Sequence, residues 1–179
     1  MIKSLNKSIH LMTFLTPLIY TKSKKNMTIQ IREAQPNDIA SIAKFQVEMA
    51  WETERYKLEI ETVTKGVSKV FECKSLGNYY VAQVNEKVVA SLLTTFEWSD
   101  WRNGTVLWIQ SVYVKKEFRK QGIYANMYKH ILDMVSQDTS LCGIRLYVDK
   151  TNTLAQEVYK NLGMNGEHYR VYEWMKEGL

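Results

Sequence analysis

Two hydrophobic patterns divide residues 28–175 into short elements. Alternating or β-branched runs predict strands, and apolar residues at every third or fourth position predict helices. The predicted strands are 28–33, Tyr79–Val84, Val88–Glu97, Thr105–Val114, Gly143–Val148 and Tyr169–Met175. The predicted helices are about 39–50, 58–73, 122–137 and 152–162. The order β-α-α-β-β-β-α-β-α-β predicts an α/β fold with one mixed central sheet flanked by helices.

Turn residues between the middle strands fix their local topology. Asn85-Glu86-Lys87 separates the second strand from the third, and Asn103-Gly104 separates the third from the fourth. Asn-Gly is a strong hairpin signal because both residues tolerate positive φ. We therefore expect these three strands to form an antiparallel meander.

Composition restricts the class of protein. With 45% hydrophobic and 24% charged residues, the chain of 179 residues can bury a sizeable core, which excludes a disordered chain. Cys73 and Cys142 cannot form a disulfide framework, so we expect two reduced thiols and a cytoplasmic protein. The three histidines are far apart without ligand spacing, which predicts no metal site.

The net charge of +5 comes from the N-terminal segment. Residues 1–27 hold five of the 24 basic residues and no acidic one, leaving 19 basic against 19 acidic residues in 28–179. The neutral body predicts no nucleic-acid partner, and the short apolar run Ile9–Tyr20 predicts no membrane span. We expect residues 1–27 to be a basic extension, disordered or preceding a true start at Met27, and 28–179 to form one domain.

A basic turn lies between the fourth strand and the third helix. Lys115–Gln121 contains four basic residues, and Gly122 opens the helix. The first turn of a helix has unpaired N–H groups and the positive end of the dipole, which together suit phosphate. A basic turn of this kind is also common as a plain solvated connector, so the motif alone leaves both interpretations open.

The segment Arg119-Lys120-Gln121-Gly122-Ile123-Tyr124 resembles the acetyl-CoA-binding motif of the GCN5-related N-acetyltransferases (GNAT), Arg/Gln-x-x-Gly-x-Gly/Ala. Tyr124 stands where the family has a small residue. The family's order of elements matches residues 28–175, so the resemblance implies a GNAT-like fold and acetyl-CoA as co-substrate. The residues it assigns to acetyl-CoA are Val112, Tyr113, Val114, Arg119, Lys120, Gln121, Gly122, Ile123, Tyr124, Ala125, Asn152 and Ala155.

A second motif follows the fifth strand. Asn152 to Met164 is similar to the family's Asn-x-x-Ala-x-x-x-Tyr-x-x-x-Gly-Phe signature, with Met164 in place of Phe. Asn152 and Tyr159 are seven residues apart and share a helix face. The resemblance places the Tyr159 hydroxyl at the CoA sulfur. A thiolate leaving group needs only modest help, which a phenol supplies as general acid, so Tyr159 is the predicted catalytic acid.

The general base and the acceptor site are less strongly marked. Glu97 is the predicted base, but an ordinary strand-end carboxylate is an equal interpretation, and His168 is a further candidate. Acids and aromatics together suit a cationic amine through cation–π and charge contacts, although the tryptophans could equally cap the core or a dimer interface. The layout around Gln110 is similar to the diamine and thialysine acetyltransferases, some of which carry a carboxylate there. The predicted acceptor residues are Trp51, Glu52, Trp98, Trp101 and Gln110.

These observations predict an acetyl-CoA-dependent N-acetyltransferase acting on a primary amine of a small molecule, with no metal. The alternative is a non-catalytic acyl-CoA-binding or regulatory domain of the same fold, which Tyr124 motivates. We expect no nucleic-acid or membrane partner, and a homodimer stays open.

Overall fold

The computed structural model describes residues 28–176, and the predicted N-terminal extension lies outside them. One five-stranded sheet has the order β1-β2-β3-β4-β5. The first four strands are antiparallel neighbours and β5 runs parallel to β4, which confirms a mixed sheet and the predicted meander. The strands are β1 (Ile29–Glu33), β2 (Asn78–Val84), β3 (Lys87–Ser99), β4 (Gly104–Val114) and β5 (Leu141–Arg145).

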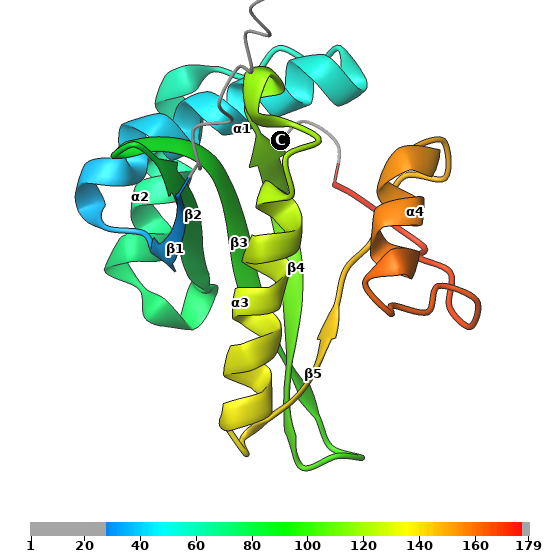
Figure 1. Ribbon diagram of the computed structural model, residues 1–179. Helices are drawn as coiled ribbons and strands as arrows, with labels where there is room; N and C mark the ends of the chain where they lie inside the picture. Colours follow the sequence, from blue (N-terminus) through cyan, green and yellow to red (C-terminus); the bar gives the residue numbers. More distant parts are fainter. Residues whose placement is uncertain (1–27, 177–179) are drawn as a thin grey trace, which may run out of the picture.

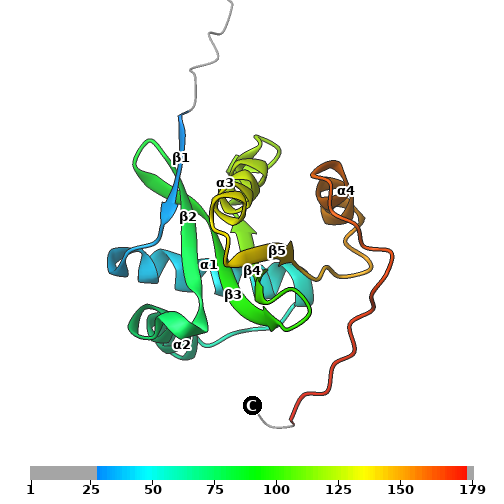
Figure 2. The same cartoon turned by 90° about the horizontal axis from the view of Figure 1, so that it is seen from below.

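The helices cover both faces of the sheet (Figures 1 and 2). Helices α1 and α2 lie on one face of the sheet and α3 lies on the opposite face, while α4 lies beyond β5 (Figures 1 and 2). The helices are α1 (Ile39–Glu54), α2 (Ile60–Glu72), α3 (Ile123–Gln137) and α4 (Thr153–Asn161). None of the helices within residues 28–176 has the length and apolar character needed to span a membrane.

The alternation of side chains along β2 explains the two layers. Tyr79 and Val81 pack with α1 and α2, whereas Tyr80 and Ala82 pack with Met127 and its neighbours on α3. A strand buried on both faces needs apolar residues at consecutive positions, which is what β2 supplies.

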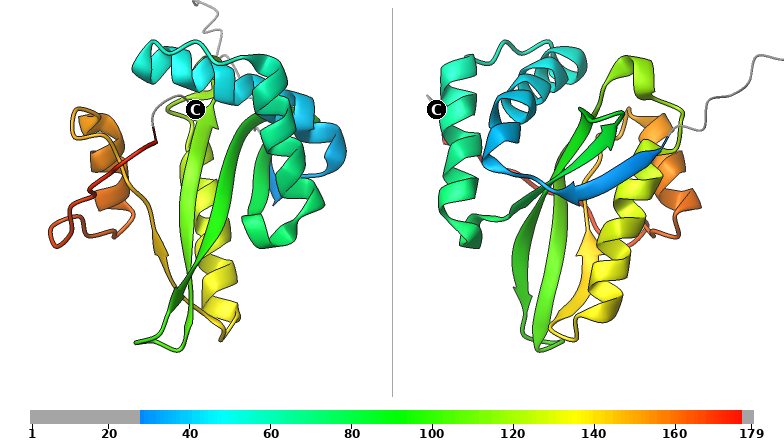
Figure 3. Two further views of the ribbon diagram at one scale, coloured as in Figure 1. Left: turned by 180° about the vertical axis from the view of Figure 1, so that it is seen from behind. Right: turned by 60° about the vertical axis from the view of Figure 1, so that its left-hand side comes forward.

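The predicted last strand, Tyr169–Met175, is wrong. These residues form no strand, and the side chains of Tyr169, Tyr172 and Trp174 are more than 80% exposed. A strand pattern produces a strand only where a neighbouring backbone accepts its hydrogen bonds. Here β5 ends at Arg145, and the described chain after α4 runs past the sheet without pairing (Figure 3).

Candidate active site

The strands β4 and β5 separate halfway along β4. Their pairing covers only Thr105 to Trp108, although β4 continues to Val114. From Ile109 onward, β4 therefore has no strand neighbour on the β5 side among residues 28–176. Backbone N–H and C=O groups on such an edge can pair with an extended ligand.

A β-bulge lies in this free part of β4. Ser91 pairs with Tyr113 and Leu93 pairs with Gln110, so Ser111 and Val112 together oppose one residue of β3. Ser111 has φ +53°, which is uncommon for a residue other than glycine and costs of the order of 1–3 kcal/mol. Bulges re-aim the backbone beside functional sites, and this one turns the Val112 backbone out of the regular ladder. The buried side chain of Gln46 on α1 donates from Nε2 to the Ser111 carbonyl at 3.5 Å.

The turn after β4 leads into the N-terminus of α3 as predicted. Gly122 is the N-cap residue, with φ +76° and no side chain to satisfy the N–H groups of the first turn. A Cβ built on Gly122 would meet only the Asn126 side chain, at 3.7 Å. The space beside Gly122 is therefore open, and the dipole of α3 makes its N-terminus favourable for an anion.

Arg119 anchors this turn to its surroundings. Its Nε donates to the Val114 carbonyl at 2.7 Å, and its Nη2 donates to Glu52 Oε2 at 2.7 Å. Tyr113 donates its hydroxyl to the other Glu52 oxygen at 2.9 Å, and Lys116 Nζ lies 3.4 Å from that oxygen. Burial raises the pKa of Glu52, but the hydrogen bonds from Arg119 and Tyr113 outweigh it and hold the pKa below its ordinary value. Glu52, predicted as an acceptor residue, thus joins the end of α1 to the basic turn.

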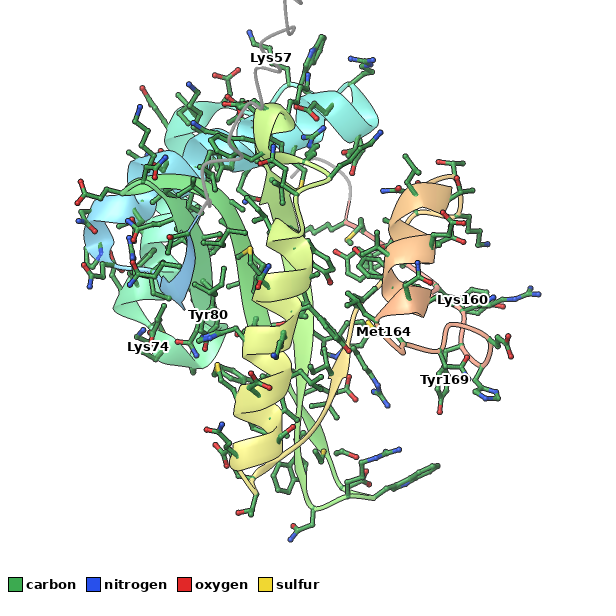
Figure 4. The ribbon with its side chains drawn as sticks, viewed as in Figure 1. Lys57, Lys74, Tyr80, Lys160, Met164 and Tyr169 are labelled. Carbon is green, nitrogen blue, oxygen red and sulfur yellow. The ribbon has the colours of Figure 1, made fainter. Side chains whose placement is uncertain are left out.

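The N-terminus of α4 is capped by Asn152, whose Oδ1 accepts from the Ala155 N–H at 3.1 Å. Further along α4, the Tyr159 ring packs edge-on against the Tyr124 ring of α3, with centroids 5.6 Å apart and planes at 68°. The segment after α4 returns to this region, because the Met164 N–H donates to the Tyr159 carbonyl at 3.0 Å. Figure 4 shows Met164 between α4 and the sheet.

Burial is the largest influence on Tyr159 and raises its pKa, whereas the neighbouring Tyr124 hydroxyl lowers it. Tyr159 is therefore a neutral phenol near neutral pH and can donate a proton. Because Tyr124 belongs to the first turn of α3, its contact with Tyr159 places this phenol beside the N-terminus of α3.

Glu97 lies elsewhere. It pairs with Val106 on β4, and its carboxylate accepts hydrogen bonds from Trp108 Nε1 and Arg145 Nη1. The bond from Trp108 is the main reason that its pKa lies below the ordinary value. Val106 is five residues from Ser111, about 17 Å at roughly 3.4 Å per residue. The structure does not bring Glu97 to the bulge.

The other predicted acceptor residues fall into separate places. Trp51 lies at the α1 end beside the basic turn, whereas Trp98 and Trp101 lie at the β3–β4 hairpin, the opposite end of β4. Trp101 is 90% exposed and touches no core. Gln110 lies next to the bulge and donates from Nε2 to Thr95 Oγ1 at 2.6 Å.

Sequence reasoning missed Gln46 and Ser111, the two residues that shape the bulge. Ser111 carries no signal, because a serine inside a strand pattern gives no indication of positive φ. Within the described residues, no three His, Cys, Asp or Glu side chains are grouped to hold a metal ion.

A strand edge without a partner from Ile109 onward leads through the basic turn to a glycine-capped helix N-terminus, which suits an extended ligand that carries a phosphate. The acetyltransferase (GNAT) family model matches residues 37–164, which is most of the chain. The chain therefore belongs to the GNAT family of acetyltransferases.

Known relatives agree with this family. A possible acetyltransferase from Clostridium difficile 630 is 43% identical, with a TM-score of 0.78 over 84% of this chain and 99% of its own. The thialysine N-epsilon-acetyltransferase of Bos taurus is 36% identical over 76 residues, 42% of this chain. The match spans 44% of that bovine protein's length. An aminoglycoside N-acetyltransferase in complex with CoA shares the fold at 12% identity, with a TM-score of 0.70 over 87% of this chain and 99% of its own.

Proposed function

We propose that the protein is an acetyl-CoA-dependent N-acetyltransferase that acetylates a primary amine of a small acceptor. The observation that carries the proposal is the combination of three features: the free edge of β4, the open N-terminus of α3 and the half-buried phenol of Tyr159. Acetyl-CoA supplies the acyl group and a thiol leaving group.

Acetyl-CoA fits the residues present. The N–H groups that follow Gly122 would hold the pyrophosphate, together with the positive charge of Lys120 and the neighbouring turn. The backbone of Val112 and Val114 would pair with the pantetheine as a strand neighbour pairs, and the re-aimed Val112 N–H would polarise the thioester carbonyl. In this arrangement Asn152 positions α4 by capping it, and Arg119 acts through the shape of the turn more than through contact with phosphate.

Tyr159 would donate a proton to the departing thiolate. Burial keeps its pKa above the ordinary value, so the phenol stays protonated over the working pH range. A general acid placed in this way contributes typically ~10²–10⁴-fold to the rate.

Two carboxylates that contact β4 side chains are held by basic side chains: Glu52, which accepts from Tyr113, pairs with Arg119 and Lys116, and Glu97 pairs with Arg145. Gln110 and Ser111 are uncharged, and Glu97 is engaged by Trp108 and Arg145 at the other end of β4. We therefore infer that the acceptor enters as the neutral amine and loses its proton to water after attack. The value of kcat/KM should then rise with pH toward the pKa of the acceptor amine, near ~10.4 for a lysine-like group.

The α1 end is the part of the predicted acceptor site that adjoins the free edge of β4. Trp51 and Tyr56 are exposed there, and the Arg55 guanidinium lies 5.9 Å from the centroid of the Trp51 ring. Such an aromatic surface can bind a cationic side group next to a neutral amine. The bovine relative, named for a thialysine substrate, supports a small amine as the acceptor class. The free thiols of Cys73 and Cys142 fit a reducing compartment such as the cytoplasm, which stays a prediction.

The test is amine-dependent thiol release from acetyl-CoA, measured with a panel of small primary amines and with each acetylated product identified by mass. The proposal expects at least one amine to give equimolar thiol and acetylated product. The alternative, a non-catalytic acyl-CoA-binding domain, expects acetyl-CoA to bind by calorimetry while no amine raises thiol release above the rate without enzyme.

A further inference from the structure

Tyr124 has a hydroxyl group that the fold itself does not use. The residue lies in the first turn of α3, where the family motif resembled by this sequence has Gly or Ala. Its hydroxyl oxygen is buried and has no hydrogen-bond partner among residues 28–176. An unpaired buried hydroxyl is destabilising, so a phenylalanine would serve the packing better. The stability of the fold therefore does not explain why position 124 carries a hydroxyl group.

Tyr159 is the neighbouring residue with which the Tyr124 hydroxyl can interact. The Tyr124 and Tyr159 rings are in contact, and each phenol changes the pKa of the other. Tyr128, one turn further along α3, is the other titratable group that acts on Tyr124, with ring centroids 6.4 Å apart. No carboxylate, ammonium or guanidinium group among the described residues shifts the pKa of Tyr124 or Tyr159. The Tyr124 hydroxyl is thus the polar group that stands beside the predicted acid.

We propose that Tyr124 is a positioning residue whose hydroxyl donates a hydrogen bond to the Tyr159 oxygen and stabilises the phenolate formed there during acetyl transfer. This inference rests on the proposed function. When the thioester C–S bond breaks, its electron pair stays on sulfur, and the Tyr159 proton passes to that sulfur. The Tyr159 oxygen then carries the negative charge and accepts the Tyr124 O–H. The proton that the amine nitrogen loses as the N–C bond forms returns to Tyr159 through solvent.

The burial of Tyr159 explains why such a donor is needed. Burial opposes the charged form of a phenol, and it is the main reason that the pKa of Tyr159 is raised. A small residue at position 124 would leave the phenolate without a donor on the α3 side. A hydrogen bond to a charged oxygen is stronger than one between neutral groups, so the bond is worth most while the phenolate exists.

The test compares Tyr124→Phe, Tyr159→Phe and their combination, with Tyr128→Phe as the matched control that removes a hydroxyl from the same helix. Tyr124→Phe should lower kcat about 10- to 100-fold, the size expected for a hydrogen bond to a charged group, and leave the acetyl-CoA KM unchanged. It should melt at or above the wild-type temperature, because it removes an unpaired buried hydroxyl. The double variant should be no slower than Tyr159→Phe alone, because both changes act on one proton transfer.

Three results would overturn the inference. The first is a kcat of Tyr124→Phe equal to that of Tyr128→Phe. The second is a double variant whose loss of kcat is the product of the two single losses, and the third is a Tyr159→Phe variant with wild-type kcat. The first two contradict the role of Tyr124 and leave the proposed function standing. The third removes Tyr159 from the mechanism as well, and failure of the wild type to acetylate any amine would contradict the proposed function itself.

Discussion

Replacing Gly122 with alanine separates two effects that the structure predicts for this position. Gly122 has φ +76°, a left-handed backbone conformation, and the nearest atom to an added Cβ is 3.7 Å away. The substitution therefore causes no steric clash with the described residues, and its cost to folding comes from the backbone alone. A left-handed residue other than glycine costs roughly 1–2 kcal/mol. For a domain of this size, 1 kcal/mol lowers Tm by about 2–4 °C, so we expect a loss of roughly 2–8 °C.

The second effect concerns the ligand. The added methyl group would enter the open space beside the first turn of α3, which is the path by which the pyrophosphate is proposed to approach. Losing one or two charge-assisted hydrogen bonds there should raise the acetyl-CoA Kd at least about 10-fold, since each such bond contributes about 1.5–3 kcal/mol.

Gly163→Ala is the matched control. Gly163 has φ +84°, and an added Cβ there meets no atom within 4 Å, so the backbone cost is the same, while the residue follows α4 and is not part of the α3 N-terminus. Melting curves and calorimetric titration with acetyl-CoA should show similar losses of Tm for both variants and a loss of affinity for Gly122→Ala alone. Equal affinity of the two variants for acetyl-CoA would refute the placement of the pyrophosphate.

Three further changes test other parts of the structure. Glu52→Gln weakens the partly exposed ion pair with Arg119 that holds the basic turn, so it should raise the acetyl-CoA KM a few-fold and cost at most about 1 kcal/mol of stability. An unchanged KM would show that acetyl-CoA binding does not need this ion pair. Asp38 is buried and receives two hydrogen bonds from Arg32, so Asp38→Asn should cost about 1.5–3 kcal/mol in urea unfolding at neutral pH. Burial raises the pKa of Asp38, but Arg32 and the Gln35 N–H outweigh it and hold the pKa below its ordinary value. The difference between wild type and variant should therefore be complete above about pH 4 and shrink as pH falls through the folded pKa; a constant difference down to pH 2 would contradict this. The pH profile of kcat/KM should rise with unit slope toward the amine pKa, whereas a plateau that begins near pH 6 to 7 would reveal a base on the protein.

Local signals in the sequence were sufficient for much of the fold. Asn103-Gly104 does form the β3–β4 hairpin, with Asn103 at φ +47°, and Gly122 does begin α3. These features depend on backbone preferences of one or two residues, which a sequence displays directly.

Features that depend on distant partners could not be predicted in the same way. The bulge at Ser111 arises from the register between β3 and β4, and Arg119 meets Glu52 only because α1 ends beside the basic turn. Glu97 has the residue type of a base, but its carboxylate accepts hydrogen bonds from Trp108 on β4 and Arg145 on β5. The sequence does not show that these residues meet Glu97. The alternating pattern of Tyr169–Met175 specifies which residues share a face, and it does not supply a partner strand.

The kcat of Tyr159→Phe, measured together with its acetyl-CoA affinity, tests the central claim most directly. The substitution removes one hydroxyl and keeps the ring that packs against Tyr124. The proposed mechanism predicts a fall in kcat of about 100-fold or more, with the Kd for acetyl-CoA and the Tm close to those of the wild type. A variant that folds, binds acetyl-CoA normally and acetylates its amine at the wild-type rate would contradict it.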